Sequence, residues 1–190
     1  MAAKMWIDLL AEQMPPAAVE ARTEADHDWT RAADGLPVPL PREFRAFVDR
    51  WGTGTIGGFI NLYTPAQGYH RVITLPDAVL SQADNYAQLK ENHPTRMTLP
   101  VFPQPGSLMS FGVTDNGDYL GWVVGSGDAD SWPVAVLDEE QRELQVFKDV
   151  TFGPFLLGVV TGSIRPEAFP EDLWDDTPLD FAPNPPATGD

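Results

Sequence analysis

The first half of the chain alternates between short amphipathic segments and breaks that contain proline or glycine. The clearest amphipathic segment lies in residues 36–54, where apolar residues at i, i+3, i+4 and i+7 form one helical face. These residues are Phe44, Phe47, Val48 and Trp51. Pro41 suits the first turn of this helix, and Gly52 suits a left-handed cap at its end. An apolar helix face needs a partner, and we expect that partner to be a β-sheet.

Residues 1–28 are predicted to contain two more helices. The first has an apolar face around Trp6 and Leu10, and Pro15–Pro16 ends it because proline cannot continue the helical hydrogen bonds. The second is expected to run from Ala17 toward Trp29 and to end at Gly35. We interpret this region as an N-terminal helical extension.

Two later segments also have helical spacing. Residues 74–94 are predicted to form a helix with Thr74 at its N-terminus in a sequence that resembles a capping box. Residues 152–162 have apolar residues at i, i+3, i+4, i+7 and i+8, with Thr151 as the expected N-cap and Gly162 as the C-cap.

Between these two helices the pattern changes to that of β-strands. Strands are predicted at 108–113, 119–124, 132–138 and 144–150, after a separate β-type run at 58–65. Asn116–Gly117 is typical of a two-residue hairpin turn in which both residues adopt positive φ. The four successive strands should form an antiparallel meander.

Helices before and after a meander indicate the α+β class, with a central antiparallel sheet and flanking helices. We divide the chain into the extension 1–28, a main domain 29–166 and an acidic, proline-rich tail 167–190. Residues 178–190 are expected to be disordered because of their composition. The apolar residues at the start of the tail are expected to dock back on the domain: Phe169, Leu173 and Trp174.

The charge balance narrows the class of partner. The 190 residues include 12 Lys and Arg against 28 Asp and Glu, which gives a net charge of -16. Such a chain repels phosphate backbones, so direct nucleic-acid binding is not expected. An acidic surface favours a basic protein partner, although acidity also serves solubility alone.

The compartment follows from what the sequence lacks. There is no cysteine, which removes disulfides and thiolate chemistry and fits a reducing compartment. The N-terminus does not have the uninterrupted apolar run of a signal peptide, and no stretch approaches the length of a membrane span. We expect a soluble, cytoplasmic protein without a membrane partner.

No cofactor or metal is expected. The sequence GTGTIG at 52–57 matches G-x-G-x-x-G, but the predicted helix precedes it and the strand follows, which reverses the dinucleotide-binding order. We interpret 52–57 as a helix-to-strand connection. The three histidines, His27, His70 and His93, do not have metal-ligand spacing. The acidic stretch from Asp128 has a proline at position six of a calcium loop, where glycine is required.

The candidate partner-binding residues lie in residues 111–134, at the turns of the meander. They are Asp115, Asn116, Asp118, Asp128, Asp130 and Trp132. Asp115 and Asn116 are explained first by the turn that they build. We expect Asp118, Asp128 and Asp130 to share one exposed rim, so that neutralising these three would leave thermal stability nearly unchanged. Trp132 is interpreted as a core residue, with the alternative that it anchors the binding face.

The order of these motifs resembles the SUKH superfamily. The resemblance covers about residues 29–166 and is carried by LPREFRAFVDRWGTG, GFINLYTP, LMSFGVTDNGDYLGWVVG, DADSWPVAV and FLLGVVTG. The superfamily contains bacterial toxin-immunity proteins and fungal regulators of cell-wall synthesis. The resemblance implies a binding protein with no catalytic residue at these positions.

Three functions are therefore compared. The resemblance implies an immunity protein that neutralises a toxin, often a nuclease. The net charge and the rim residues favour an acidic surface as its contact. The second is an intracellular regulator or scaffold of the fungal type. The third is a hydrolase that uses two carboxylates, for which no pair of Asp or Glu stands out in the sequence.

Overall fold

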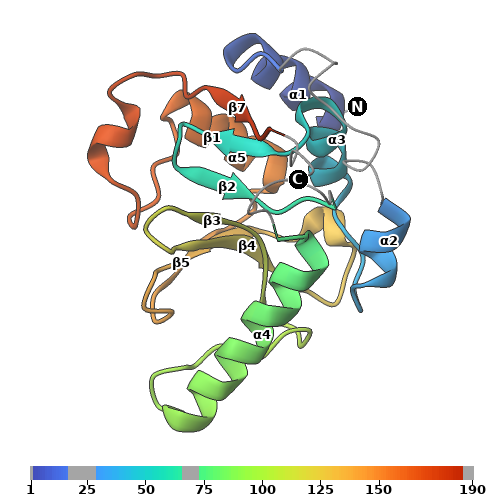
Figure 1. The fold of residues 1–190 in the computed structure, drawn as a ribbon, viewed down its shortest axis with the longest axis vertical. Helices are drawn as coiled ribbons and strands as arrows, with labels where there is room; N and C mark the ends of the chain where they lie inside the picture. The colour runs from blue at the N-terminus through green and yellow to red at the C-terminus, as the bar shows by residue number, and fades with distance from the viewer. Residues whose placement is uncertain (1, 17–28, 66–72, 186–190) are drawn as a thin grey trace, which may run out of the picture.

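The computed structural model describes residues 2–16, 29–65 and 73–185, which form one antiparallel sheet with helices on both faces (Figure 1). In these residues the sheet has seven strands, in the order β6-β5-β4-β3-β2-β1-β7. The predicted α+β class, with a central antiparallel sheet and flanking helices, is confirmed.

The predicted meander forms the larger part of the sheet. Its strands pair antiparallel in succession: β3 (Leu108–Thr114), β4 (Tyr119–Val123), β5 (Val134–Leu137) and β6 (Leu144–Phe147). The hairpin at Asn116–Gly117 is confirmed, but only Gly117 adopts a positive φ, of 99°. The turn is therefore not of the type in which both central residues do so.

Two short strands extend the sheet beyond β3. They are β2 (Ile60–Leu62), inside the predicted run, and β1 (Gly54–Ile56). The interpretation of residues 52–57 as a connection is wrong, because Gly54–Ile56 forms β1, in which Thr55 and Ile56 pair with β2. Glycine is uncommon inside strands, so the sequence did not indicate a strand here. Gly54 is required because a side chain at this position would collide with Phe181 and Ala182.

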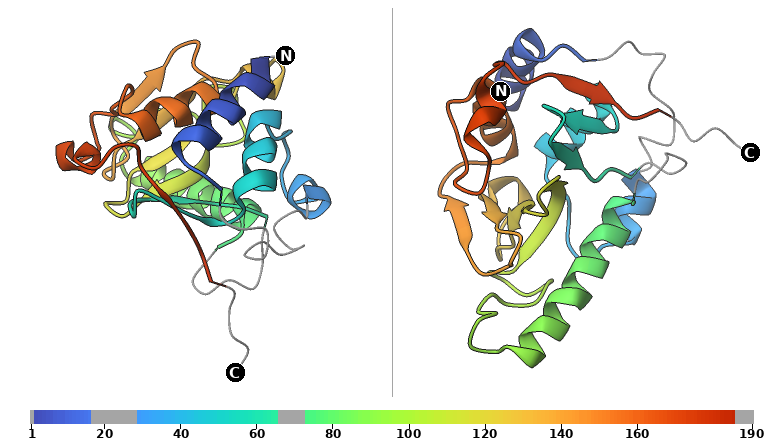
Figure 2. Two further views of the ribbon diagram at one scale, coloured as in Figure 1. Left: turned by 90° about the horizontal axis from the view of Figure 1, so that it is seen from above. Right: turned by 60° about the vertical axis from the view of Figure 1, so that its left-hand side comes forward.

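The helices divide between the two faces of the sheet (Figure 2). Their bounds are α1 (Ala2–Gln13), α2 (Trp29–Asp34), α3 (Arg42–Trp51), α4 (Leu75–Asn92) and α5 (Phe152–Thr161). α4 packs against β3 on one face, while α1, α3 and α5 contact one another on the opposite face. The predicted helix from Ala17 falls mostly outside the described residues, and only α2 at its end is seen.

The core lies between the sheet and the α1, α3 and α5 layer, and aromatic rings fill its centre. Phe44 of α3 contacts Trp122 of β4 and Phe152 of α5 edge-on, each at 5.3 Å between ring centroids. Phe111 of β3 lies 4.6 Å from Trp122 and 5.1 Å from Phe152. The predicted burial of Trp51 and Trp122 is confirmed, since neither is exposed to solvent.

Two of the helices on the core face, α3 and α5, begin without a side-chain capping bond from the preceding residue. Pro41 precedes α3 and has no side-chain acceptor. Thr151 is the N-cap residue of α5, as predicted, but its side chain makes no capping hydrogen bond. At α5 the backbone N–H of Gly153 donates instead to Glu43 Oε2 at 2.9 Å. A carboxylate from the first turn of α3 thus takes the place of the local cap.

The helix C-termini follow the predictions more closely. Gly162 adopts the left-handed conformation, with φ 73° and ψ 11°. Gly52 also has a positive φ, of 78°, as predicted. Its ψ of -153° lies outside the left-handed helical region, so the predicted left-handed cap is not formed. Both positions require a backbone that residues with a Cβ rarely adopt.

The tail differs most from its prediction. The docking of its start is confirmed, since Phe169 and Trp174 are buried and Trp174 lies in the short 3-10 turn η4 (Glu171–Trp174). Residues 178–185 are not disordered, because β7 (Phe181–Pro183) pairs with β1 and Leu179 is buried. The first helix and the tail thus contribute to the same core as the rest of the chain.

We predict that Gly54→Ala detaches β7 from the sheet. A Cβ at this position would lie 2.4 Å from the carbonyl oxygen of Ala182 and from Phe181 Cζ, and one of the two strands must move. Overpacking of this kind costs about 1–3 kcal/mol of unfolding free energy. Urea unfolding should show this loss, and limited proteolysis should cut the tail faster.

Gly127→Ala is the matched control. A Cβ there meets no atom within 4 Å, and its φ is not positive, so its stability should stay within about 0.5 kcal/mol of the parent protein. Equal stability of the two variants would contradict the close approach at Gly54.

Candidate protein-binding surface

The predicted acidic rim does not exist as one surface. Asp115, Asn116 and Asp118 lie in the connection from β3 to β4, whereas Asp128 and Asp130 lie in the connection from β4 to β5. Successive connections of an antiparallel meander leave from opposite ends of the shared strand. The two groups are therefore separated by the length of β4.

Asp118 is a buried structural residue, and only 3% of it is exposed. Its Oδ2 accepts from Thr114 Oγ1 at 2.7 Å, and its Oδ1 accepts from the backbone N–H of Glu139 at 3.2 Å. The carboxylate thus joins the turn after β3 to the turn after β5. Its expected place on an exposed rim is wrong.

The two carboxylates at the other end of β4 accept backbone N–H groups. Asp128 Oδ1 accepts from the N–H of Asp130 at 3.1 Å and caps the 3-10 turn η3 (Ala129–Ser131). Asp130 Oδ1 accepts from the N–H of Arg42 at 2.6 Å, and its Oδ2 pairs with the Arg42 guanidinium. Asp130 thereby caps α3, which Pro41 cannot do.

The remaining members of the predicted set divide between core and surface. Trp132 is 4% exposed and belongs to the hydrophobic core, so the core interpretation is confirmed and the alternative of an exposed anchor is wrong. Asp115 and Asn116 are exposed. Asp115 Oδ1 accepts from Asn61 Nδ2 at 2.8 Å, which links the turn to β2.

We predict that Asp118 and Asp130 are needed for stability, in contrast to the expectation from sequence. Asp118→Ala leaves buried partners without an acceptor, and Asp130→Ala removes a helix cap. Each should lower the unfolding free energy by about 1–3 kcal/mol, measured by urea denaturation. Asp115→Ala is the control on an exposed turn, and a loss equal to that of Asp118→Ala would contradict this assignment.

A group of carboxylates, most of them without such roles, gathers on what we call the acidic surface. It lies over the turn after β5 and over residues 165–180, and three adjoining hollows of the molecular surface run through it. Neighbouring hollows share Glu167 and Asp172. The acidic residues that line them are Asp138, Glu143, Glu167, Glu171, Asp172, Asp175, Asp176 and Asp180.

The acidic surface has little positive charge to balance it. In the described part of the chain, Arg165 is the one basic residue lining these hollows, and its guanidinium carbon lies 5.0 Å from the centre of the Trp174 ring. None of the described residues forms an ion pair with the carboxylates of residues 167–180. Asp138 differs from the rest, because its Oδ1 accepts the N–H groups of Arg142 and Glu143.

The packing of the tail explains why these carboxylates face outward. Phe169, Trp174 and Leu179 insert into the core, and Trp174 Nε1 donates to Val159 O at 2.8 Å. The acidic residues lie between these anchors, where they remain in solvent. Glu167 is held through its backbone N–H, which donates to Gln145 Oε1 at 2.9 Å.

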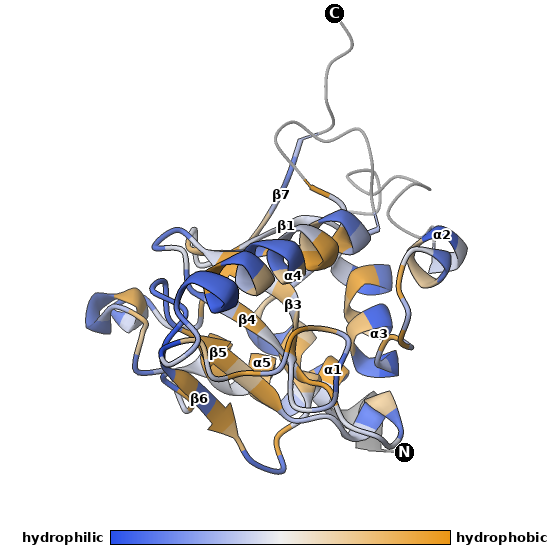
Figure 3. Ribbon diagram, turned by 90° about the horizontal axis from the view of Figure 1, so that it is seen from below, coloured by the Kyte–Doolittle hydropathy of each residue, from blue (hydrophilic) through white to orange (hydrophobic). Residues whose placement is uncertain are grey.

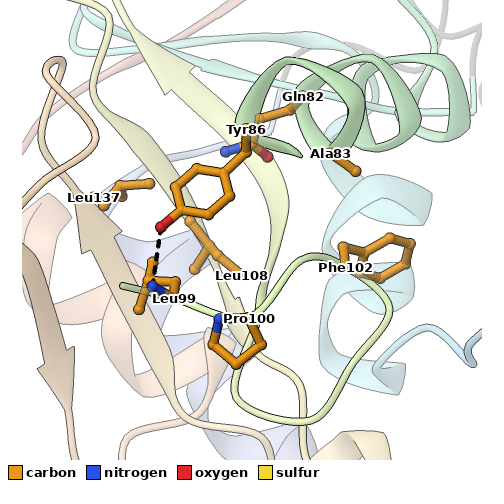
Figure 4. A pocket seen from close by; sticks show the side chains of 8 residues that line it. All are labelled: Gln82, Ala83, Tyr86, Leu99, Pro100, Phe102, Leu108 and Leu137. Atoms are coloured by element: carbon orange, nitrogen blue, oxygen red, sulfur yellow. Dashed lines mark hydrogen bonds between the residues drawn. The ribbon is translucent and has the colours of Figure 1, made fainter. Parts of the chain in front are cut away.

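A small pocket lies on the face of the sheet that α4 covers, between α4 and the strands (Figure 4). Its volume is about 20 Å³, which is room for one water molecule rather than a substrate. The Tyr86 hydroxyl accepts from the N–H of Leu99 at 3.0 Å, and the Lys90 ammonium donates to Leu99 O. These bonds tie the loop after α4 to the helix.

The same face of the sheet is partly open beside α4. Strand register places Asn61, Val113, Tyr119, Leu137 and Leu144 in one row across it. Most of this row is partly buried and not fully covered. Nearby, burial raises the pKa of Tyr63 to about 12, and the neighbouring Tyr119 adds to the shift.

The raised pKa of Tyr63 predicts how the free energy of unfolding changes at alkaline pH. Its folded pKa of about 12 lies above the ordinary value of 10.0, so the unfolded chain loses this proton first. The free energy of unfolding should therefore fall as the pH rises from about 10 to about 12. Urea unfolding of Tyr63→Phe should give a smaller fall over the same range; identical curves would contradict the burial of this hydroxyl.

The described residues contain no group of three or more His, Asp or Glu side chains placed to hold a metal ion. His93 is exposed, and His27 and His70 lie outside the described residues. Within the same residues, no helix has both the length and the apolar character needed to cross a membrane.

Comparison with known proteins adds no relative, because no protein-family model, curated protein or solved structure matches this chain. The resemblance to the SUKH superfamily therefore stays a prediction from sequence motifs. The α+β fold is established by the structure alone.

Proposed function

We propose that the chain is a binding protein without catalytic activity that neutralises a basic toxin domain, as bacterial SUKH-like immunity proteins do. The observation that carries this proposal is the acidic surface, where carboxylates line adjoining hollows with Arg165 as the basic residue among them. The net charge of -16 adds long-range attraction for a basic partner. A nuclease has a basic cleft for phosphate, and the acidic surface complements such a cleft.

The acidic surface replaces the predicted rim in this proposal for a physical reason. Carboxylates that already accept backbone N–H groups, such as Asp118 and Asp130, contribute to folding and have less free capacity for a partner. The carboxylates between Glu167 and Asp180 are exposed and have no ion-pair partner among the described residues. Their charge is available to another molecule.

Charge neutralisation is the appropriate test, since deleting the tail would remove core residues. The surface variant carries Glu167→Gln, Glu171→Gln, Asp172→Asn and Asp176→Asn. The control variant carries the same number and kind of changes on exposed positions elsewhere: Glu12→Gln, Glu91→Gln, Asp34→Asn and Asp84→Asn. Both variants lose the same charge, so a difference between them reports position and not net charge.

We predict that the parent protein and the control variant retain a basic protein from a lysate of the native cell, and that the surface variant does not. Once that protein is purified, its affinity for the surface variant should be at least about tenfold lower, or about 1.4 kcal/mol. Titration calorimetry at two salt concentrations measures this, since higher salt should weaken the parent complex. Equal affinity of the two variants would reject the acidic surface as the contact.

The regulatory alternative remains a prediction that the same experiment separates. A cell-wall-type regulator would retain a resident cellular protein, whereas an immunity protein would retain a toxin whose activity it suppresses. A carboxylate-based hydrolase also stays a prediction; it requires turnover that is lost when a single Asp or Glu is neutralised with folding intact.

A further inference from the structure

The free edge of the sheet at β6 (Leu144–Phe147) lies beside the acidic surface. β6 pairs with β5 alone and ends the strand order on that side, and Figure 3 shows it at the outside of the sheet. The hollow lined by Glu143 and Glu167 also contacts Leu144 and Gln145 of the strand. The strand edge and the carboxylates therefore form one continuous surface.

The hydrogen bonds between β5 and β6 determine which backbone groups of β6 have no partner in the sheet. The N–H of Asp138 donates to Glu143 O at 3.1 Å, and bonded pairs alternate along an antiparallel ladder. Gln145 is accordingly bonded to Val136, its partner in the register. The N–H and C=O groups of Leu144 and Val146 face the open edge.

The edge lacks the usual protection against another strand. Natural edge strands carry a proline, a charged residue or a bulge, or are covered by another segment. Residues 144–147 contain neither proline nor charge, and Lys148 comes only after the strand. Val146 is 36% exposed. Among the described residues, it is the only exposed large apolar side chain that lies on a strand.

The opposite edge of the sheet makes the contrast clear. There β7 has three residues and ends at Pro183, which has no N–H to offer a neighbour. Proline is a common protection of an edge strand, and β6 does not contain one.

We infer that β6 accepts an extended, basic segment of the protein partner as an additional strand. Main-chain hydrogen bonds to Leu144 and Val146 would provide affinity, and the nearby carboxylates would select positive side chains. A second copy of this chain is disfavoured as the occupant, because each copy carries a net charge of -16. This inference rests on the proposed function and specifies how the partner is held.

The probe for this edge is a nine-residue peptide of alternating Lys and Val. Two control peptides are used: one with Glu in place of Lys, and one with two adjacent central amides N-methylated, which blocks both edges of the peptide. Binding is followed by ¹H–¹⁵N correlation spectra and by hydrogen exchange of the amides of Leu144 and Val146. We expect the Lys–Val peptide to shift both amides and slow their exchange at least about fivefold, and neither control peptide to do so.

Val146→Pro is the decisive variant, because it removes an N–H that faces the open edge and leaves the bonds to β5 in place. Peptide affinity should fall at least about tenfold while circular dichroism and thermal unfolding stay those of a folded protein. If this variant does not fold, Val146→Lys keeps the backbone and sets a positive charge against the basic peptide, and it should weaken binding similarly. Unchanged affinity in the folded variant overturns the inference.

The other outcomes also separate the edge from the acidic surface. If the methylated peptide binds as well as the unmethylated one and shifts amides of residues 167–180 only, the edge site is wrong and the proposed function stands. Equal binding of the Glu–Val peptide overturns the selection for a basic strand. A dimer in sedimentation that Val146→Pro dissolves makes a second copy the occupant, which also overturns the inference.

Discussion

The placement of α3 and α5 on this sheet depends on carboxylates from distant parts of the chain. Asp130, in the connection after β4, accepts the first N–H of α3, and Glu43, in the first turn of α3, accepts an N–H of α5. The negative charge of each acceptor also suits the positive end of its helix. The connection after β4 thus holds the N-terminus of α3, and α3 holds the N-terminus of α5. These bonds position the two helices in addition to their packing in the aromatic core.

This arrangement gives the acidic residues two distinct uses. One group saturates backbone donors inside the fold, as Asp118 does between two turns. The other group lies between the apolar anchors of the tail and has only solvent around it. A uniformly acidic surface destabilises itself by repulsion, and a basic partner would relieve that repulsion when it covers the second group. The sheet edge at β6 adds a directional element to an otherwise non-directional attraction.

The sequence predicted the parts of the fold that depend on local patterns. Phe44, Phe47 and Trp51 have helical spacing and are buried together, and the meander follows from four alternating runs with turns between them. The left-handed conformation at Gly162 was equally readable. In each of these cases the deciding neighbours lie within a few residues.

The rest of the site could not be predicted because its partners are remote. The bond from Arg42 to Asp130 spans 88 residues, and the one from Gly153 to Glu43 spans 110. No local rule distinguishes a carboxylate that caps a distant helix from one that faces solvent. The end of the tail was missed for the same reason: its composition is typical of disorder, but Leu179 is buried and β7 pairs with the remote strand β1.

The position of β7 has a consequence for biosynthesis. Its partner β1 is made early, but β7 follows every other element of the described chain. Until β7 has been made and has paired, the edge of β1 has no strand to cover it, and an uncovered strand edge is a site of misassembly. Pairing of β7 ends this exposure.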